Sequence, residues 1–181
     1  MNLSAGSVRV IAAILALALP SAARAFAAPE PRKPFDVGHM AGRWYEIART
    51  PNHINQGCQG STTDWAADGP GKFRISAVCH KGAPDGPEKV IHAEVRITDP
   101  VTHAKVRMAL LGGLISSEYW LLDHADDYRW LIMGTPNGRF ISIMASRPHL
   151  PADARAEALN TARRMGYDIS GLVFPVQSPA P

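Results

Sequence analysis

The sequence predicts an all-β protein: an eight-stranded antiparallel up-and-down β-barrel with one C-terminal α-helix packed against its outside. Apolar and polar residues alternate along successive short runs, as they do in strands with one apolar and one wet face. Turn-forming residues separate these runs at Asp68–Gly71, Pro84–Pro87, Asp99–Pro100, Gly112–Gly113, Asp126–Asp127 and Pro136–Gly138. Strands joined by short hairpins form a meander, and closing the meander removes its exposed edges.

The first 25 residues are predicted to be a secretory signal. Arg9 precedes an apolar run over residues 10–19, and small residues follow as far as Ala27. Ten apolar residues are too few to cross a bilayer, which needs about 20. We therefore expect cleavage after Ala25 or Ala27 and a periplasmic or secreted protein, with a buried N-terminal helix as the alternative. Residues 26–36 are Pro-rich and predict an extended lead-in, the barrel domain spans residues 37–177, and residues 178–181 form a tail.

Charge and motif composition exclude several classes of function. The formal net charge is +3, and removing Arg9 and Arg24 with the signal, which contains no acidic residue, leaves +1. The basic residues are scattered, so nucleic-acid binding is not expected. The seven histidines show no metal-ligand spacing and no nucleophile motif is present, so the sequence predicts no metal, no cofactor and no catalytic residue.

The inner face of the predicted barrel is apolar and contains small residues. Ala77, Ala93 and Ala104 favour a partly empty lumen, although a barrel of about eight strands also fits an interior filled by side chains. An apolar lumen with few polar groups suits an acyl chain. The expected ligand-contacting residues are Val95, Met108, Tyr119, Leu121 and Ile143. The Tyr119 hydroxyl is expected to meet a lipid headgroup, with a tyrosine anchored at the surface as the alternative.

The clearest helix of the sequence spans residues 148–166. Pro151 suits the first helical position and Gly166 suits its end. Asp153 in the first turn and Arg163 and Arg164 in the last turn complement the helix dipole. A stripe of small residues would let this helix lie close to the barrel wall; it consists of Ala154, Ala158 and Ala162, with Met165 in line and Leu159 alongside.

The two cysteines of the chain are expected to form a disulfide. Cys58 and Cys79 lie at nearly opposite positions across the hairpin that turns at Asp68–Gly71. Antiparallel partners are about 4.5 to 5.5 Å apart at Cα, which is within disulfide reach, and an exported protein meets oxidising conditions. Two buried free thiols are the alternative.

Three segments resemble the signatures of the lipocalins, in the order that this family has them. Gly42-Arg43-Trp44-Tyr45-Glu46-Ile47-Ala48-Arg49 resembles the first signature, in the form typical of the bacterial branch and its apolipoprotein D-like relatives. Asp127-Tyr128 and Ser146-Arg147-Pro148 resemble the second and third. The resemblance covers roughly residues 37–177.

The resemblance implies a structural role for Gly42, Trp44 and Arg147. The matching Trp plugs the closed end of a lipocalin barrel and the matching Arg lies across it, a cation–π contact of about 0.5 to 2 kcal/mol. It also implies a short helical turn at the closed end, before the first strand. Some bacterial lipocalins have a lipid-modified Cys at the mature N-terminus; Cys58 is the first cysteine here, so lipid anchoring is not expected.

The resemblance further implies binding of a small hydrophobic ligand, a fatty acid or lysophospholipid, in the cell envelope. Peripheral contact with a membrane, and a monomer or homodimer, are compatible with it. Two alternatives remain open. One is a lumen enzyme with isomerase or epoxide chemistry, for which Glu46 is the only carboxylate of the first signature. The other is a packed barrel that serves only as an interaction module.

Overall fold

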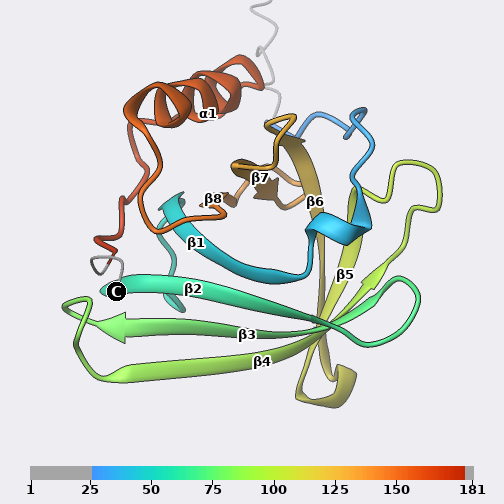
Figure 1. The fold of residues 1–181 in the computed structure, drawn as a ribbon, viewed down its shortest axis with the longest axis horizontal. Helices are drawn as coiled ribbons and strands as arrows, with labels where there is room; N and C mark the ends of the chain where they lie inside the picture. The colour runs from blue at the N-terminus through green and yellow to red at the C-terminus, as the bar shows by residue number, and fades with distance from the viewer. Residues whose placement is uncertain (1–25, 178–181) are drawn as a thin grey trace, which may run out of the picture.

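A computed structural model of the protein describes residues 26–177, and in it eight antiparallel strands close into a barrel in sequence order (Figure 1). The strands are β1 (Gly42–Arg49), β2 (Cys58–Ala67), β3 (Lys72–Lys81), β4 (Glu88–Ile97), β5 (Lys105–Leu110), β6 (Ile115–His124), β7 (Trp130–Gly134) and β8 (Ile141–Ala145). Every predicted turn falls between two strands, so the predicted fold class is confirmed. The predicted signal and the tail at 178–181 lie outside the described residues.

One α-helix and two 3-10 helices complete the described part of the chain. Helix α1 (Ala152–Arg164) follows β8, η1 (Val37–His39) precedes β1, and η2 (Leu111–Gly113) joins β5 to β6. Thus η1 supplies the helical turn that the family resemblance implies. Pro151 flanks α1 as its N-cap, with an extended ψ of 149°, instead of occupying the first helical position. Within residues 26–177, none of the helices has the length and apolarity needed to cross a membrane.

Two apolar cores lie on opposite sides of the barrel wall. The first, here called the lumen core, is formed by inward-facing strand residues and by two residues that precede β1. Its members are Phe35, Met40, Trp44, Trp65, Phe73, Ile75, Ala93, Val95, Ala104, Val106, Leu121, Leu131, Met133 and Met144. All of them are less than a tenth exposed to solvent, so the lumen core excludes water.

The second core, here called the wall core, joins the outside of the barrel to α1. Its members are Ala28, Ile47, Ala48, Leu122, Ala125, Trp130, Ile132, Ile141, Ile143, Ala145, Ala154, Ala158, Ala162, Tyr167 and Leu172. The helix contacts β7 and lies on the outer side of the barrel in Figure 1. Leu159 and Met165 flank the buried alanines of α1, as predicted. The small residues allow the close approach of helix and wall.

A β-bulge in β1 decides which side chains of this strand face the lumen. In the β1–β8 ladder, Glu46 pairs with Met144 and Ala48 pairs with Ile143, so Ile47 is the extra residue. Ile47 and Ala48 therefore both face the wall core. Regular alternation would send Glu46 and Arg49 to opposite faces, but the bulge directs both of them inward.

The barrel seam between β1 and β2 is completed by the segment that follows α1. The two strands pair directly only from Gly42 to Tyr45, and beyond Tyr45 they diverge. Val173 fills part of the gap by exchanging two backbone hydrogen bonds of 2.9 Å with Arg49. On the other side of the gap, the Gly60 amide donates to the Val176 carbonyl at 2.8 Å. The Gln177 side chain then bridges the strands by donating to the carbonyls of Glu46 and Ser61.

Candidate functional site

The closed end of the lumen is plugged by aromatic residues. Trp44 is 3% exposed, and its indole N–H donates to the Met40 carbonyl at 3.2 Å. Trp65 and Phe73 meet edge to face, with ring centroids 5.8 Å apart. Gly42, two residues before Trp44, has a φ of 111°, a conformation that other residues rarely adopt, so the glycine allows the entry into β1.

A second aromatic group closes the same end from below. The ring of Tyr128, from the predicted second signature, stacks on His124 with centroids 4.3 Å apart and contacts His39 at 4.0 Å. Its hydroxyl accepts a hydrogen bond from the Asp36 amide at 2.9 Å. These contacts join the end of the lead-in to the β6–β7 turn, so Phe35 and Asp36 are part of the floor of the barrel.

Inward-facing residues above this floor are less buried than those of the floor. Ala77, Ile91, Met108 and Tyr119 share the inward side of their strands with the lumen core, but they are only partly buried. They lie toward the end of the barrel formed by the loops at residues 50–57, 82–87, 111–114 and 135–140. We call this end the mouth. We call the inner side of the barrel, from the floor of buried aromatic rings to these partly buried apolar side chains, the cup.

The structure places four of the five predicted ligand-contacting residues in or against the lumen core. Val95 and Leu121 are 1% and 3% exposed and belong to the floor, whereas Met108 and Tyr119 lie higher and are partly buried. The inward assignment of Ile143 is wrong, because Ile143 belongs to the wall core under α1. Contact of any of these residues with a ligand stays a prediction.

Tyr119 is the polar group of the upper lumen that the sequence singled out. Its ring meets Phe140 edge to face with centroids 6.2 Å apart, and the surrounding apolar side chains partly bury it. This burial raises the pKa of the Tyr119 hydroxyl, because the charged form is poorly solvated there. The hydroxyl therefore stays protonated and able to donate at neutral pH.

A buried polar cluster at the lumen side of β1 and β8 was not predicted. The Glu46 carboxylate accepts a hydrogen bond from the Arg49 guanidinium at 2.8 Å and another from the Ser142 hydroxyl at 3.0 Å. Burial is the main influence on Glu46 and raises its pKa, which Arg49 and Ser142 oppose. Arg49 Nε and Ser61 Oγ are buried without a hydrogen-bond partner. Sequence alternation hides this cluster, because the bulge at Ile47 is what brings Glu46 and Arg49 to one face.

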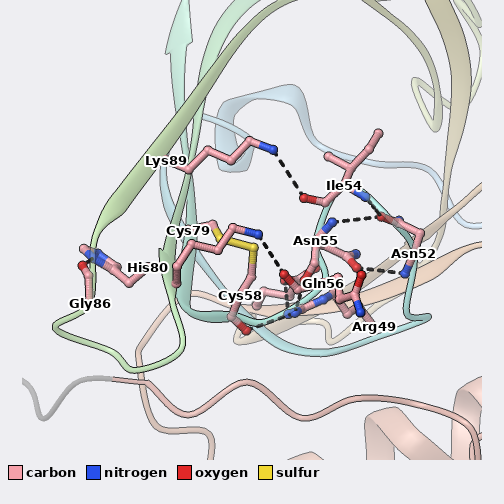
Figure 2. Close-up of a disulfide and its surroundings, with 12 residues drawn as sticks. Arg49, Asn52, Ile54, Asn55, Gln56, Cys58, Cys79, His80, Gly86 and Lys89 are labelled. Atoms are coloured by element: carbon pink, nitrogen blue, oxygen red, sulfur yellow. Dashed lines mark hydrogen bonds and ion pairs between the residues drawn. A yellow bond between two sulfur atoms is a disulfide. The ribbon is translucent and has the colours of Figure 1, made fainter.

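Arg49 also holds the loop at residues 50–57 at the mouth (Figure 2). Its guanidinium donates to the carbonyls of Asn55 at 2.8 Å and Cys58 at 3.0 Å. Next to it, Cys58 and Cys79 form the predicted disulfide, with Cα atoms 5.2 Å apart. The direct partner of Cys58 is Lys81, because the hairpin pairs Ala67 with Phe73 and the bulge between Gln59 and Thr62 shifts this register by only one residue. The disulfide therefore crosses the hairpin diagonally. The disulfide thus fixes β2 to β3 beside the mouth.

The predicted contact between Trp44 and Arg147 is not formed. Arg147 is exposed, and it lies just beyond β8, where the chain leaves the barrel wall. Among residues 26–177, the cation–aromatic contacts are those of Lys105 with Trp120 and Arg155 with Phe174. Trp44 instead packs in one core with Phe35 of the lead-in and Met40, which follows η1. The floor of this barrel is therefore apolar where the resemblance implied a guanidinium.

A groove of about 960 Å³ lies along the outer side of β2, β3 and β4, beside η2. Its lining includes the outward-facing Asp64 and Ala66, but also Ile75, Ile91 and Ala93, which share the inward side of their strands. The first half of β4 extends beyond its pairing with β5, which begins at Glu94, so an edge of this strand is free at the groove. We call this hollow the outer groove; it is lined by both apolar and charged residues of the barrel wall.

A closed barrel of this order, with a plugged floor, an apolar mouth and one outer helix, is the architecture of the lipocalin fold. The chain belongs to that family: a family model described as "Lipocalin-like domain" matches residues 35–177. Lipocalins generally bind small hydrophobic molecules.

Relatives of known name agree with this assignment. The chain is 25% identical to the outer membrane lipoprotein Blc of Escherichia coli (strain K12) over 147 residues, covering 80% of each chain. It is 24% identical to apolipoprotein D of Mus musculus over 166 residues, 84% of this chain and 82% of that protein. Among solved structures, insecticyanin from the tobacco hornworm Manduca sexta matches with a TM-score of 0.65 and 19% identity, covering 82% of this chain and 84% of that one.

Proposed function

We propose that this protein binds an acyl lipid, a fatty acid or lysophospholipid, with its chain in the cup and its polar end at the mouth. The supporting observation is the gradient along the lumen, from a sealed floor at Trp44 to half-buried Ala77, Met108 and Tyr119 at the mouth. A cup open at one end accepts a linear apolar chain and leaves its polar end in water.

The cell envelope is the proposed location. The apolar run at residues 10–19 predicts export, and two of the relatives are named outer membrane lipoproteins in Escherichia coli and Vibrio cholerae. The disulfide between Cys58 and Cys79 supports an oxidising compartment such as the periplasm.

Contact with a lipid surface through the mouth is part of the same proposal. Leu111 and Leu114 at the β5–β6 turn are 72% and 86% exposed, and Ile54 on the loop after β1 is 62% exposed. Apolar side chains at the rim would let the mouth meet a membrane, where acyl lipids are found.

Binding without turnover is the proposed activity, and the state of Glu46 supports it. Glu46 is the carboxylate on which a lumen enzyme would depend, and it is engaged by Arg49 and Ser142. A general base must reach the proton that it removes from a substrate, and a carboxylate already held by two donors is poorly placed to do so.

The test is a titration of the purified protein with saturated fatty acids and lysophosphatidylcholines of increasing chain length, followed by tryptophan fluorescence and by the melting temperature. Each added methylene that enters the cup should contribute about 0.8 kcal/mol until the cup is full. Ligand bound only to the folded state should also raise the melting temperature. If no lipid of any length changes either signal, the acyl-lipid proposal is wrong.

Two matched variants separate the cup from the outer groove. Ala77 is half-buried on the inward side of β3, and Ala109 lines the outer groove. We expect Ala77→Trp to weaken binding of long chains and Ala109→Trp to leave it unchanged. The opposite result would place the ligand in the outer groove. Ala93 is less suitable for this test, because it is only 8% exposed within the lumen core and a larger side chain there would disturb packing.

A further inference from the structure

The residue that follows Ala25 is built into the folded domain. The ring of Phe26 meets Tyr167 edge to face, with centroids 4.9 Å apart and an interplanar angle of 77°. Tyr167 follows α1 and belongs to the wall core, where its hydroxyl is buried without a partner and burial raises its pKa to about 12. Phe26 therefore packs over Tyr167 at one end of the wall core.

Two glycines leave room for the Phe26 ring. A Cβ on Gly138, in the β7–β8 turn, would come within 2.6 Å of Phe26 Cδ1. A Cβ on Gly166, after α1, would come within 2.7 Å of Phe26 Cε2. Real Cβ atoms do not approach other atoms so closely, so either side chain would push the ring out. Gly138, Gly166 and Tyr167 together form a notch for Phe26.

The next residues continue this attachment. The Ala28 amide donates to the Pro136 carbonyl at 3.1 Å, and Ala28 is only 9% exposed within the wall core. The segment at residues 26–28 therefore fastens the β7–β8 turn to the end of α1. Because that turn is one of the loops of the mouth, the attachment also steadies the rim.

The sequence alone allows two cleavage positions, since Ala23-Arg24-Ala25 and Ala25-Phe26-Ala27 both have small residues where a signal peptidase needs them. The notch distinguishes between them. Cleavage after Ala27 would discard the ring that fills the notch. It would also turn the Ala28 amide into a charged chain end at a buried position, which is costly.

We infer that a signal peptidase cuts between Ala25 and Phe26, so that Phe26 is the first residue of the mature protein. Water adds across that peptide bond, leaving a carboxylate on Ala25 and a new α-amino group on Phe26. The exported chain keeps the whole attachment from Phe26 to Ala28, with the notch occupied.

The direct test is export of the full-length chain in a Gram-negative host, followed by N-terminal sequencing and intact mass of the protein recovered from the envelope. The expected sequence begins Phe-Ala-Ala-Pro. A protein that begins at Ala28, at any other residue, or at Met1 would overturn the inference.

A second measurement tests the notch itself. We expect Phe26→Ala to lower the melting temperature of the exported protein by about 2 to 4 °C, which corresponds to a modest loss in a domain of this size. Phe174→Ala is the matched control, because Phe174 is 39% exposed against 42% for Phe26 but lies against Arg155 and outside the notch. The expected loss for Phe174→Ala is smaller. Equal losses, or no loss for Phe26→Ala, would show that the notch does not hold the chain end.

Discussion

The lumen core and the wall core lie on the two sides of one barrel wall, yet they are built from different residues. The wall core is rich in alanine, with Ala158 and Ala162 fully buried on the helix that crosses it. The lumen core contains large aromatic and sulfur-containing side chains, among them Trp44, Trp65 and Met133. Small residues let a helix and a sheet pack closely against each other. Methionine side chains are flexible and can adjust their packing when the content of the lumen changes.

The comparison shows how one wall can serve two purposes. The members of the wall core are buried between α1 and the barrel, so we expect their packing to affect mainly the stability of the fold. The lumen core is buried at the floor, whereas Met108 and Tyr119, which pack against it toward the mouth, are only partly buried. A change in the wall core should therefore alter stability alone, and a change high in the lumen should alter binding. The predictions below test this division.

The largest effect is expected at the floor of the lumen core. Trp44→Ala should destabilise the protein by about 3 to 5 kcal/mol, the usual cost of truncating a buried Trp. Arg147→Ala should change stability by less than about 0.5 kcal/mol, because Arg147 is exposed. Urea unfolding of both single variants and of the double variant measures these values. The double variant should show the two losses added together; a strong departure from additivity would mean that Arg147 does cover Trp44.

An intermediate effect is expected in the wall core. Ala158→Leu should destabilise by about 1 to 3 kcal/mol, because Ala158 is fully buried between α1 and the barrel and a larger side chain would overpack this contact. The control is Ala156→Leu, an identical change on the exposed side of the same helix, which should be nearly neutral. Thermal unfolding compares the two, and acyl-lipid binding at a temperature where both are folded should be unchanged. If Ala158→Leu weakened binding specifically, the two cores would not be independent.

The smallest effect concerns the polar cluster, and it is visible as a dependence on pH. Burial raises the pKa of Glu46, so the folded protein holds this proton more tightly than the unfolded chain does. The contribution of Glu46 to stability is then greatest below the unfolded pKa and declines as pH rises toward the folded pKa.

Glu46→Gln provides the reference for that measurement, since the amide does not titrate. The unfolding free energy of the wild type minus that of Glu46→Gln should decrease with rising pH in the weakly acidic range, by at most about 1.4 kcal/mol per pH unit. Urea unfolding at constant ionic strength follows this difference. An increase with pH would show that the ion pair with Arg49 outweighs burial.

The strands could be predicted because most of the wall has one wet face. In β4 the buried residues alternate with exposed ones, and the pattern is visible in the sequence. In β7 and β8 every residue is buried, because the lumen lies on one side and α1 on the other. In such strands the alternation of apolar and polar residues cannot tell the lumen face from the helix face. This is the physical reason why the sequence pattern places Ile143 in the lumen instead of under α1.

The sequence predicted the apolar residues of the lumen and the disulfide, but it did not predict the polar cluster around Glu46. Turn positions and register were enough to pair Cys58 with Cys79, since a diagonal across a hairpin still lies within disulfide reach. The cluster of Glu46 and Arg49 depends on a single extra residue in β1, which no residue pattern marks. The exposure of Arg147 likewise depends on how the chain leaves β8. The features that could not be predicted from the sequence are therefore irregularities of the backbone, namely the bulge at Ile47 and the path of the chain after β8.

The seam between β1 and β2 has a consequence for the order in which the protein is assembled. Val173, Val176 and Gln177 are synthesised after all eight strands. Val173 and Val176 supply the missing backbone partners of Arg49 and Gly60, and Gln177 bridges the carbonyls of Glu46 and Ser61. The floor already needs residues from β3, β6, β7 and β8, so the barrel can close only after β8 has been made. The seam at the rim needs residues that are made later still, so the C-terminal segment is the last part of the chain that the barrel requires.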